Sequence, residues 1–386
     1  MLLLITCVEA LIGQWAEMNA ISSGEVCYFP RISKKTHTKA SEAWLCTARG
    51  CGRIQRKTAH YKQGNYSIDF KEIVNASIGA GCVMHPGVAF LTHELDNIGH
   101  ESRDLYILAR LVRSNISISA VLSRCTLFPS RNWHSTTILH LESTIRALLD
   151  AQAVPPMAST MTLVSQGAAD AWRSRTSRCA CFSDVVQKDY LGESVRADRL
   201  AAVDRAFYRE AVYRSCSIVD PLPSHVLVLN RSTTRAWEAS TLAWLTHQLA
   251  ARFELPIVAY NPGGDSFCNQ VSAFAKASFV ALHHGAELAG NGPFLPNGAV
   301  VLEMQMQMGS ASGNEALRTY GLAVVPSLSV FSNSFPHCSF GSYFSHAECK
   351  LRLNITKFLP TLSAAVALHR TLNPDFTHYS SHIDLQ

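Results

Sequence analysis

His225–Leu229 reads HVLVL, and this stretch decides the fold that the sequence predicts. Pro223 precedes the run and Asn230 follows it, so a short apolar segment stands between two turn signals. Such a run is typical of a short β-strand. Further along, apolar residues at helical spacing over Ala239–Arg252 predict a helix, and PIVAY at Pro256–Tyr260 predicts the next strand.

The same alternation continues toward the C-terminus. Ser266–Ala277 has helical spacing, whereas Phe279–Leu282 (FVAL) and Gly298–Met304 (GAVVLEM) are short apolar runs. Strands that alternate with helices predict βαβ units and an α/β fold with a mostly parallel sheet. Because ligands bind at the carboxyl ends of parallel strands, the loops that follow these strands are the informative ones.

The first half of the chain shows this pattern less strongly. Strands are predicted at Val83–Leu91 and Ser117–Leu122, and helices at Asp104–Val112 and Ser143–Ala151. Residues 14–60 are polar and basic and predict a stem or an irregular lobe, while Ala158–Arg178 is rich in Ser, Thr, Arg and Ala and predicts a loop.

The composition excludes several classes of protein. The chain has 386 residues, of which 47% are apolar and 16% charged, and its net charge is +5. A chain this apolar can bury substantial cores, which excludes wholesale disorder. The Lys and Arg residues are spread along the chain rather than gathered in one basic face, so we expect no nucleic-acid partner.

The loops at the predicted strand ends carry the candidate chemistry. Arg231 and Arg235 follow HVLVL and are four residues apart, so both guanidinium groups could reach one anion. His284-Gly285-Ala286 follows FVAL, where the glycine permits close approach of the backbone and a helix N-terminus could face a phosphate. Glu303 ends the GAVVLE run, where a carboxylate could accept ribose hydroxyls. Surface arginines, a structural histidine and a solvated strand-end carboxylate are the alternatives.

Together these residues resemble the shared block of the family 61 glycosyltransferases. That family includes the EGF-domain-specific O-GlcNAc transferase, the protein O-mannose N-acetylglucosaminyltransferase and plant xylan arabinosyl- and xylosyltransferases. The matching positions, in order along His225–Met304, are Arg231, Arg235, Ser266-Phe267, Gln270, His284-Gly285-Ala286, Phe294-Leu295-Pro296, Gly298-Ala299 and Glu303. Two departures stand out, because Glu287 occupies the place of a family glycine and one residue is inserted before Phe294.

The N-terminal half resembles the family more weakly. Asn97 and His100, followed by Glu101 and Asp104, are similar to the family's Asn-x-x-His segment with an acid shortly after it. The resemblance covers about residues 85–305, with gaps.

The resemblance implies a GT-B-like fold, which has two facing Rossmann-like domains with a cleft between them. On that basis we expect a targeting, stem or irregular segment at 1–60, an acceptor-side domain at 61–222, a nucleotide-sugar-binding domain at 223–345, and a C-terminal helix and tail at 346–386.

The implied reaction is inverting transfer of a sugar from a nucleotide donor, expected to be UDP-linked, to a hydroxyl of a glycan or glycoprotein. Such a displacement needs a base for the acceptor proton and positive charge on the leaving diphosphate. His100, Glu101 and Asp104 are the candidates for the base, and Arg231 and Arg235 are assigned to the leaving group. The donor-binding candidates also include His284, Gly285, Ala286, Ser266, Gln270 and Glu303. No cofactor is required by the sequence, no metal ligands are assigned, and a divalent metal is left open.

Three other classes of function are alternatives to a transferase. A non-catalytic secretory binding protein that retains the fold is the main alternative, and it depends on Glu287 and the inserted residue. A hydrolase is disfavoured because Gly309–Gly313 places Ala311 where a nucleophilic serine is needed. A Rossmann dehydrogenase is disfavoured because no G-x-G-x-x-G follows a predicted strand.

Sequons favour the secretory route, in the Golgi or endoplasmic reticulum lumen. They lie at Asn65, Asn75, Asn115, Asn230 and Asn354, and the first three and the last are the expected glycosylation sites. The 12 cysteines fit a few disulfides in a secretory protein or buried thiols in a cytosolic one. Met1–Gly13 is apolar except for Glu9 and fits an atypical signal, the remnant of a membrane anchor, or an ordinary buried segment.

Overall fold

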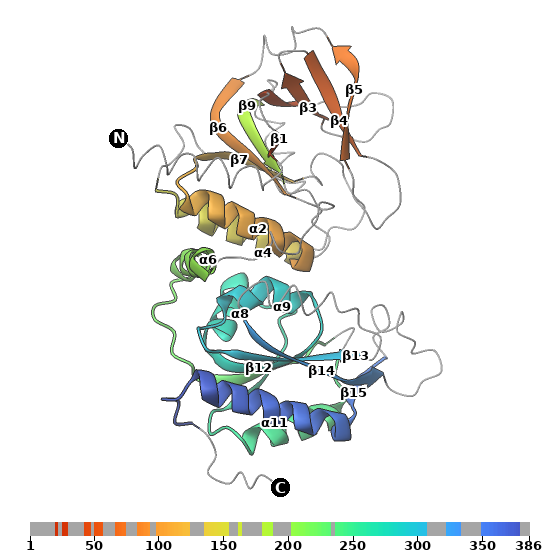
Figure 1. Ribbon diagram of the computed structural model, residues 1–386, viewed down its shortest axis with the longest axis vertical. Coiled ribbons are helices and arrows are strands. Elements are labelled where there is room, and N and C mark those ends of the chain that lie inside the picture. Colours follow the sequence, from red (N-terminus) through yellow and green to blue (C-terminus); the bar gives the residue numbers. More distant parts are fainter. Residues whose placement is uncertain are drawn as a thin grey trace. The chain divides into compact units, whose positions relative to one another are not determined.

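The computed structural model describes residues 20–21, 25–29, 42–47, 50–56, 66–74, 83–92, 98–123, 135–153, 161–163, 180–187, 202–232, 236–306, 322–332 and 349–378. The chain divides into two compact units, Met1–Ala197 and Asp198–Gln386, and each has its own sheet (Figure 1). None of the described helices is both long and apolar enough to cross a membrane. Met1–Gly13 lies outside the described residues.

The first unit is built on a nine-stranded mixed sheet. Its strands are β1 (Ala20–Ile21), β2 (Glu25–Phe29), β3 (Glu42–Thr47), β4 (Gly50–Arg56), β5 (Tyr66–Val74), β6 (Val83–Thr92), β7 (Ile118–Ser123), β8 (Met161–Leu163) and β9 (Ala180–Gln187). The main path through the sheet is β5-β4-β3-β2-β9-β6-β7-β8, and β1 pairs with β9. Helices α2 (Ile98–Arg113) and α4 (Ser135–Asp150) connect β6 to β7 and β7 to β8.

One half of this sheet is parallel and the other is antiparallel. Strands β9, β6, β7 and β8 run parallel, as βαβ units require. Strands β2 to β5 add to the free side of β9 as an antiparallel meander. The parallel half confirms the predicted strands around Val83 and Ser117 and the predicted helices that follow them.

Residues 14–60 differ from the sequence expectation, since they include four strands rather than an irregular lobe. Each run is short and lies among polar residues, so its local pattern is weak. Val26 and Cys27 pair with Phe182 and Cys181, which are distant in the sequence. Because this pairing is long-range, the local sequence could not show it. The predicted loop at 158–178 likewise contains the short strand β8.

The second unit is a doubly wound α/β domain with a six-stranded sheet in the order β11-β10-β12-β13-β14-β15. Its elements are α6 (Ala202–Ser215), β10 (His225–Leu229), α7 (Ala239–Ala250), β11 (Ile257–Tyr260), α8 (Phe267–Ala275), β12 (Ala277–His283), α9 (Ala286–Asn291), the 3-10 helix η2 (Gly292–Phe294), β13 (Val300–Met306), β14 (Ala323–Ser332), β15 (Leu351–Leu353) and α11 (Ile355–Leu372). All neighbouring strands are parallel except β14 and β15.

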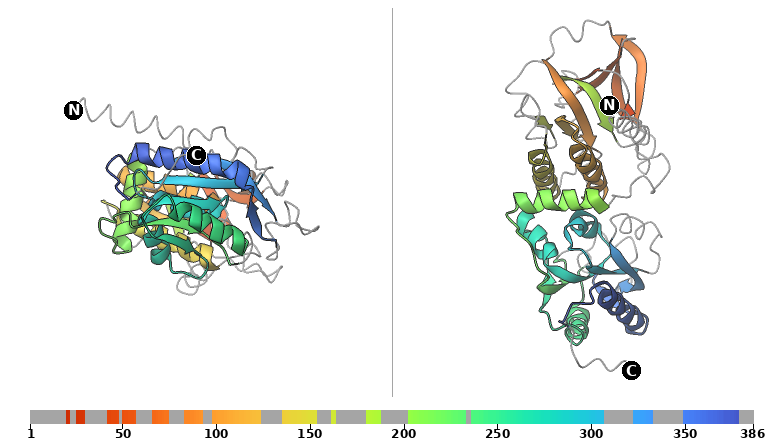
Figure 2. Two further views of the ribbon diagram at one scale, coloured as in Figure 1. Left: turned by 90° about the horizontal axis from the view of Figure 1, so that it is seen from below. Right: turned by 60° about the vertical axis from the view of Figure 1, so that its left-hand side comes forward.

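The HVLVL strand lies between β11 and β12 in this sheet and is covered on both faces. Val226 and Val228 belong to the core formed with α7 and α11, in which Leu249 and Phe358 are also buried. Leu227 on the opposite face is fully buried as well. Helix α11 lies along one face of the sheet, while α8 and α9 cover the other (Figure 1 and Figure 2). The predicted strand at His225–Leu229 is therefore confirmed.

The second unit begins earlier than the boundary expected at residue 223, since α6 belongs to it. The unit also includes β15 and α11, which lie in the segment at 346–386 that was expected as a C-terminal helix and tail. Trp237 bridges to Leu351, and Phe358 of α11 is fully buried in the same core. These elements join the unit through long-range packing, which local periodicity does not reveal.

Candidate functional site

The carboxyl edge of the second sheet has a topological switch point between β10 and β12. From β10 the chain crosses to β11 on one side, and from β11 it returns past β10 to β12 on the other side. In doubly wound sheets the crevice at such a point, outside the strand ends, is the usual ligand site. Arg231 follows β10 and His284 follows β12, so both lie at this edge.

Arg231 forms an ion pair with Glu287, which lies in the first turn of α9. The Arg231 NH1 and Glu287 Oε1 atoms are 2.8 Å apart, and the two side chains are 22% and 14% exposed. Arg231 is therefore not a solvated surface arginine, because a mostly buried carboxylate balances its charge. Arg235 lies outside the described residues, so the two-arginine anion site is described only at Arg231.

The loop that carries Arg231 is anchored by Trp237, which is 4% exposed. The Trp237 indole Nε1–H donates to the Leu229 carbonyl at 2.9 Å, and its backbone N–H donates to Asn230 Oδ1 at 3.4 Å. The loop thus closes back onto the end of its own strand. This anchoring holds the Arg231 backbone beside the switch point, and it leaves the Asn230 sequon half-buried.

His284 is hydrogen-bonded to a buried carboxylate from the neighbouring strand. Its Nδ1 lies 2.6 Å from Oε1 of Glu303, whose side chain is 1% exposed while that of His284 is 48% exposed. Gln305 donates from Nε2 to the second oxygen, Oε2, at 3.1 Å.

The position of Glu303 corrects two expectations from the sequence. β13 continues past Glu303 to Met306, because its ladder with β14 extends beyond that point. Glu303 is therefore neither a strand end nor exposed to water. Both of its oxygens contact protein groups, and the ribose contact that the sequence suggested stays a prediction.

His283 and His284 point to different environments although they are adjacent. His283 is fully buried, and its ring centroid lies 5.9 Å from that of Trp237. The backbone N–H of His284 donates to the Met304 carbonyl at 2.8 Å, which extends the ladder between β12 and β13 by one residue. Gly285 has φ of −178°, an extended backbone that any residue adopts. Helix α9, which follows it, has only six residues.

Ser266 and Gln270 lie at the start of α8, which follows the carboxyl end of β11 at the same edge of the sheet. The Ser266 hydroxyl accepts a hydrogen bond from the Asn269 backbone N–H at 3.2 Å and so caps the helix. Gln270 Nε2 donates to the carbonyls of Pro262 and Asp265, each at 3.2 Å. These bonds hold the turn between β11 and α8 against the helix.

Asp265, in the same turn, accepts from two side chains. Asn269 Nδ2 donates to Oδ1 at 2.9 Å, and the Tyr260 hydroxyl donates to Oδ2 at 2.8 Å. The hydrogen bonds from Asn269 and Tyr260 hold the pKa of the Asp265 carboxyl below its usual range.

Helix α6, which sequence reasoning missed, holds the Phe294-Leu295-Pro296 segment. The Tyr213 hydroxyl donates to the Phe294 carbonyl at 2.5 Å, and Arg205 donates from NH2 to the Leu295 carbonyl at 2.9 Å. Tyr208 stacks on Phe294 with ring centroids 5.5 Å apart. Burial raises the pKa of Tyr213 to about 12, so its hydroxyl remains a donor. The spacing of these residues on one helix face was the available signal.

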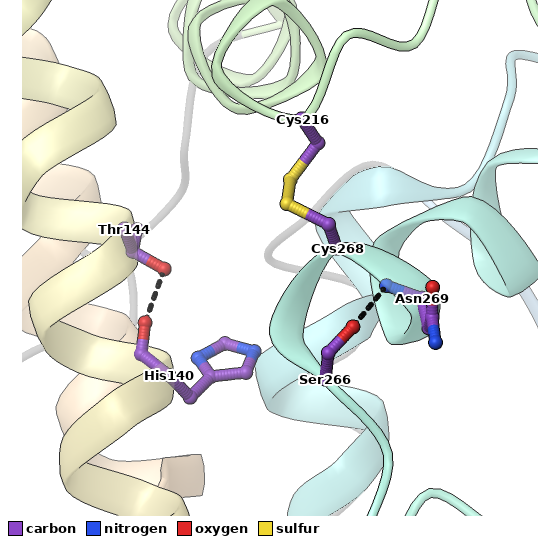
Figure 3. The surroundings of a disulfide bond; sticks show 6 residues. All are labelled: His140, Thr144, Cys216, Ser266, Cys268 and Asn269. Atoms are coloured by element: carbon purple, nitrogen blue, oxygen red, sulfur yellow. Dashed lines mark hydrogen bonds between the residues drawn. A yellow bond between two sulfur atoms is a disulfide. The ribbon is translucent and has the colours of Figure 1, made fainter.

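A disulfide joins Cys216, just after α6, to Cys268 in the first turn of α8 (Figure 3). The bond therefore links the helix that holds Phe294 to the helix that Ser266 caps. Cys349 is also disulfide-bonded.

The remaining candidates lie in the first unit or on the surface. His100, Glu101 and Asp104 lie in the first two turns of α2, and their side chains are outside the described residues. Asn115 is exposed in the turn after α2, and Asn354 is exposed at the N-cap of α11, whereas Asn65 and Asn75 are outside the described residues. Within the described ranges, no three His, Cys, Asp or Glu side chains converge as a metal site.

Comparison with known proteins adds little to this description. No family model matches the chain, and no curated protein matches it. Among solved structures, the chain is similar to the bacterial iron-containing dodecameric glycosyltransferase TibC from enterotoxigenic E. coli H10407. That match has a TM-score of 0.27 and 10% sequence identity, and it covers 74% of each chain. A TM-score this low carries no argument about fold or function.

Proposed function

We propose that the protein is an inverting glycosyltransferase that moves a sugar from a UDP-linked donor to a hydroxyl of a glycan or glycoprotein. The observation that carries the proposal is the placement of Arg231 and His284 together at the switch point of a doubly wound sheet. That edge is where such sheets bind nucleotides, and an arginine there can bind a diphosphate. The sequence resemblance of the same block supports this assignment.

In this proposal the second unit binds the donor and the first unit contributes to the acceptor side, in a GT-B-like arrangement. Arg231 stabilises the charge that develops on the leaving diphosphate, and Arg235 is the second candidate for that role. His284 and the Gly285-Ala286 backbone close the donor pocket. Ser266 and Gln270 keep the α8 turn in place through the contacts described above. His100, Glu101 and Asp104 are the first-unit candidates for the catalytic base.

We further propose that the protein works in the lumen of the Golgi or endoplasmic reticulum. The disulfide between Cys216 and Cys268 supports this, since such bonds persist in oxidising compartments. The sequons at Asn115 and Asn354 are exposed and so accessible for glycosylation. An N-terminal anchor or signal at Met1–Gly13 belongs to the same proposal.

The alternative is a binding protein that keeps the fold without catalysis. The ion pair between Arg231 and Glu287 favours the binding protein, because the arginine proposed to bind phosphate is already paired with a carboxylate. The two functions differ in turnover rather than in nucleotide binding.

A donor screen separates the two functions. The full chain is incubated with a panel of UDP- and GDP-sugars, and donor hydrolysis is measured alongside UDP binding by calorimetry. Lys276→Ala is a matched control, because Lys276 is an exposed cation just before β12, at the opposite edge of the sheet. UDP binding with turnover supports the transferase, and UDP binding without turnover supports the binding protein. A protein that neither binds UDP nor hydrolyses any donor refutes the donor site.

A further inference from the structure

Glu303 is a buried carboxylate with both oxygens engaged by protein side chains. Its Oε1 lies 2.6 Å from His284 Nδ1, and its Oε2 accepts from Gln305 Nε2 at 3.1 Å. Glu303 and Gln305 are 1% and 4% exposed. A carboxylate in this position does not reach a ligand, but it orients the imidazole ring that it touches.

This contact determines which ring nitrogen of His284 carries the proton. A carboxylate accepts hydrogen bonds, so the neutral ring that faces it has the proton on Nδ1 and the lone pair on Nε2. The His284 side chain is 48% exposed at the carboxyl end of β12. The buried Glu303 carboxylate therefore holds the His284 ring at Nδ1. The His284 side chain itself is partly exposed to solvent.

We propose that His284 is the general base of the transfer reaction, with Glu303 and Gln305 as the residues that position it. The inference rests on the proposed function and assigns the acceptor proton to His284 in place of the first-unit candidates His100, Glu101 and Asp104. A base oriented by a buried carboxylate through its other nitrogen is a recurrent arrangement in nucleophilic catalysis.

The proposed transfer is a single displacement at the anomeric carbon of the donor sugar. The acceptor hydroxyl oxygen forms a bond to the anomeric carbon of the donor sugar, while the bond from that carbon to the phosphate oxygen breaks. The electron pair of the broken bond leaves with the nucleoside diphosphate. The hydroxyl proton moves to His284 Nε2, and the Glu303 carboxylate stabilises the imidazolium that results.

The first test reads the tautomer directly and needs no substrate. The full chain is labelled with ¹⁵N-histidine, and the ring signals of His284 are those that His284→Gln removes from the 16 histidines. We expect the neutral ring in the wild type to carry its proton on Nδ1, and Glu303→Gln to abolish that preference. A wild-type ring protonated on Nε2, or an unchanged tautomer in Glu303→Gln, overturns the positioning role.

The second test separates catalysis from binding. In Glu303→Gln and in His284→Gln we expect kcat to fall about 10²-fold or more, the typical contribution of a general base. In Glu303→Gln the KM for the donor and the affinity for UDP should stay within about two-fold of wild type, because both Glu303 oxygens contact protein groups. The double variant should be no worse than His284→Gln alone, because the two residues act as a unit. His247→Gln, at an exposed position of α7, is the control that leaves turnover unchanged.

The outcomes distinguish this inference from the proposed function. An active wild type whose Glu303→Gln variant keeps its kcat, or loses only donor affinity, overturns the role of Glu303. Loss of turnover in Glu101→Gln or Asp104→Asn, with turnover kept in His284→Gln, moves the base to the first unit. A wild type with the expected tautomer that neither binds UDP nor consumes any donor refutes the transferase, and the base assignment falls with it.

Discussion

Glu287 holds Arg231 in an ion pair with 2.8 Å between Oε1 and NH1, at the edge where the donor diphosphate is proposed to bind. The carboxylate stands where the resembling family has glycine. The Glu287 carboxylate therefore competes with the donor phosphate for the Arg231 guanidinium. Substitutions of Glu287 and of Arg231 each test this.

Removing the charge of Glu287 is expected to strengthen nucleotide binding. In Glu287→Gln the guanidinium of Arg231 no longer faces a carboxylate, so UDP affinity should rise by about 1 kcal/mol, roughly five-fold. Calorimetry with UDP measures the change. An unchanged or weaker affinity would show that Glu287 does not compete with the ligand.

Removing Arg231 is expected to weaken nucleotide binding. Arg231→Ala deletes a charge-assisted phosphate contact, at a cost of about 1.5–3 kcal/mol in UDP affinity. Because that change also leaves Glu287 without its cation, Arg231→Ala/Glu287→Ala is the matched comparison. Equal UDP affinity in the wild type and both variants would remove Arg231 from the donor site.

The disulfide between Cys216 and Cys268 is expected to stabilise the second unit. It closes a loop with a sequence separation of 52 residues, and replacing both cysteines by serine should lower the free energy of unfolding by about 2–4 kcal/mol. Denaturant unfolding of the double variant measures this loss. A variant as stable as the wild type would contradict the expectation.

Acid is expected to destabilise the second unit through His369. The ring packs against Phe253, Phe279 and Phe376, and burial lowers its pKa from 6.5 to about 4. The unfolded chain therefore binds a proton near pH 6.5 while the folded chain resists it. The stabilisation that comes from keeping the His369 ring neutral is fully present above pH 6.5. As the pH falls toward 4 it is lost, and the free energy of unfolding drops by up to ~3 kcal/mol.

Thermal unfolding between pH 7 and pH 4 measures this effect, with His369→Phe as the comparison. The variant should show a shallower loss of melting temperature. Part of the slope should remain, because burial also lowers the pKa of His225. Identical pH profiles would mean that His369 does not carry the acid sensitivity.

Glycans are expected at Asn115 and Asn354, the exposed sequons of the described chain, when the protein is made in a secretory host. Asn354 Oδ1 also accepts from the Lys357 N–H as the N-cap of α11, so Asn354→Gln would disturb the helix as well. Thr356→Ala removes the sequon and keeps the cap. Endoglycosidase gel shifts on Thr356→Ala and Ser117→Ala count the sites, and no shift in the wild type would contradict the secretory route.

Much of the second unit could be predicted from local pattern. The strands at His225–Leu229 and Phe279–Leu282, and the helix from Ser266, appear in the structure within a few residues of their predicted bounds. These elements have strong periodicity because they are buried in a parallel sheet or packed on it. The edge that carries Arg231 and His284 was predictable, since both residues follow predicted strands.

The local pattern of the sequence is enough to predict the order of these elements, and therefore the edge of the sheet to which Arg231 and His284 belong. The partners of these side chains depend on how the whole unit packs. Glu303 lies 19 residues from His284, and α6 lies about 80–90 residues from the carbonyls that it binds. Periodicity reports which face of an element is buried, whereas the pairing of two side chains depends on strand register and helix packing, which form only when the whole unit folds.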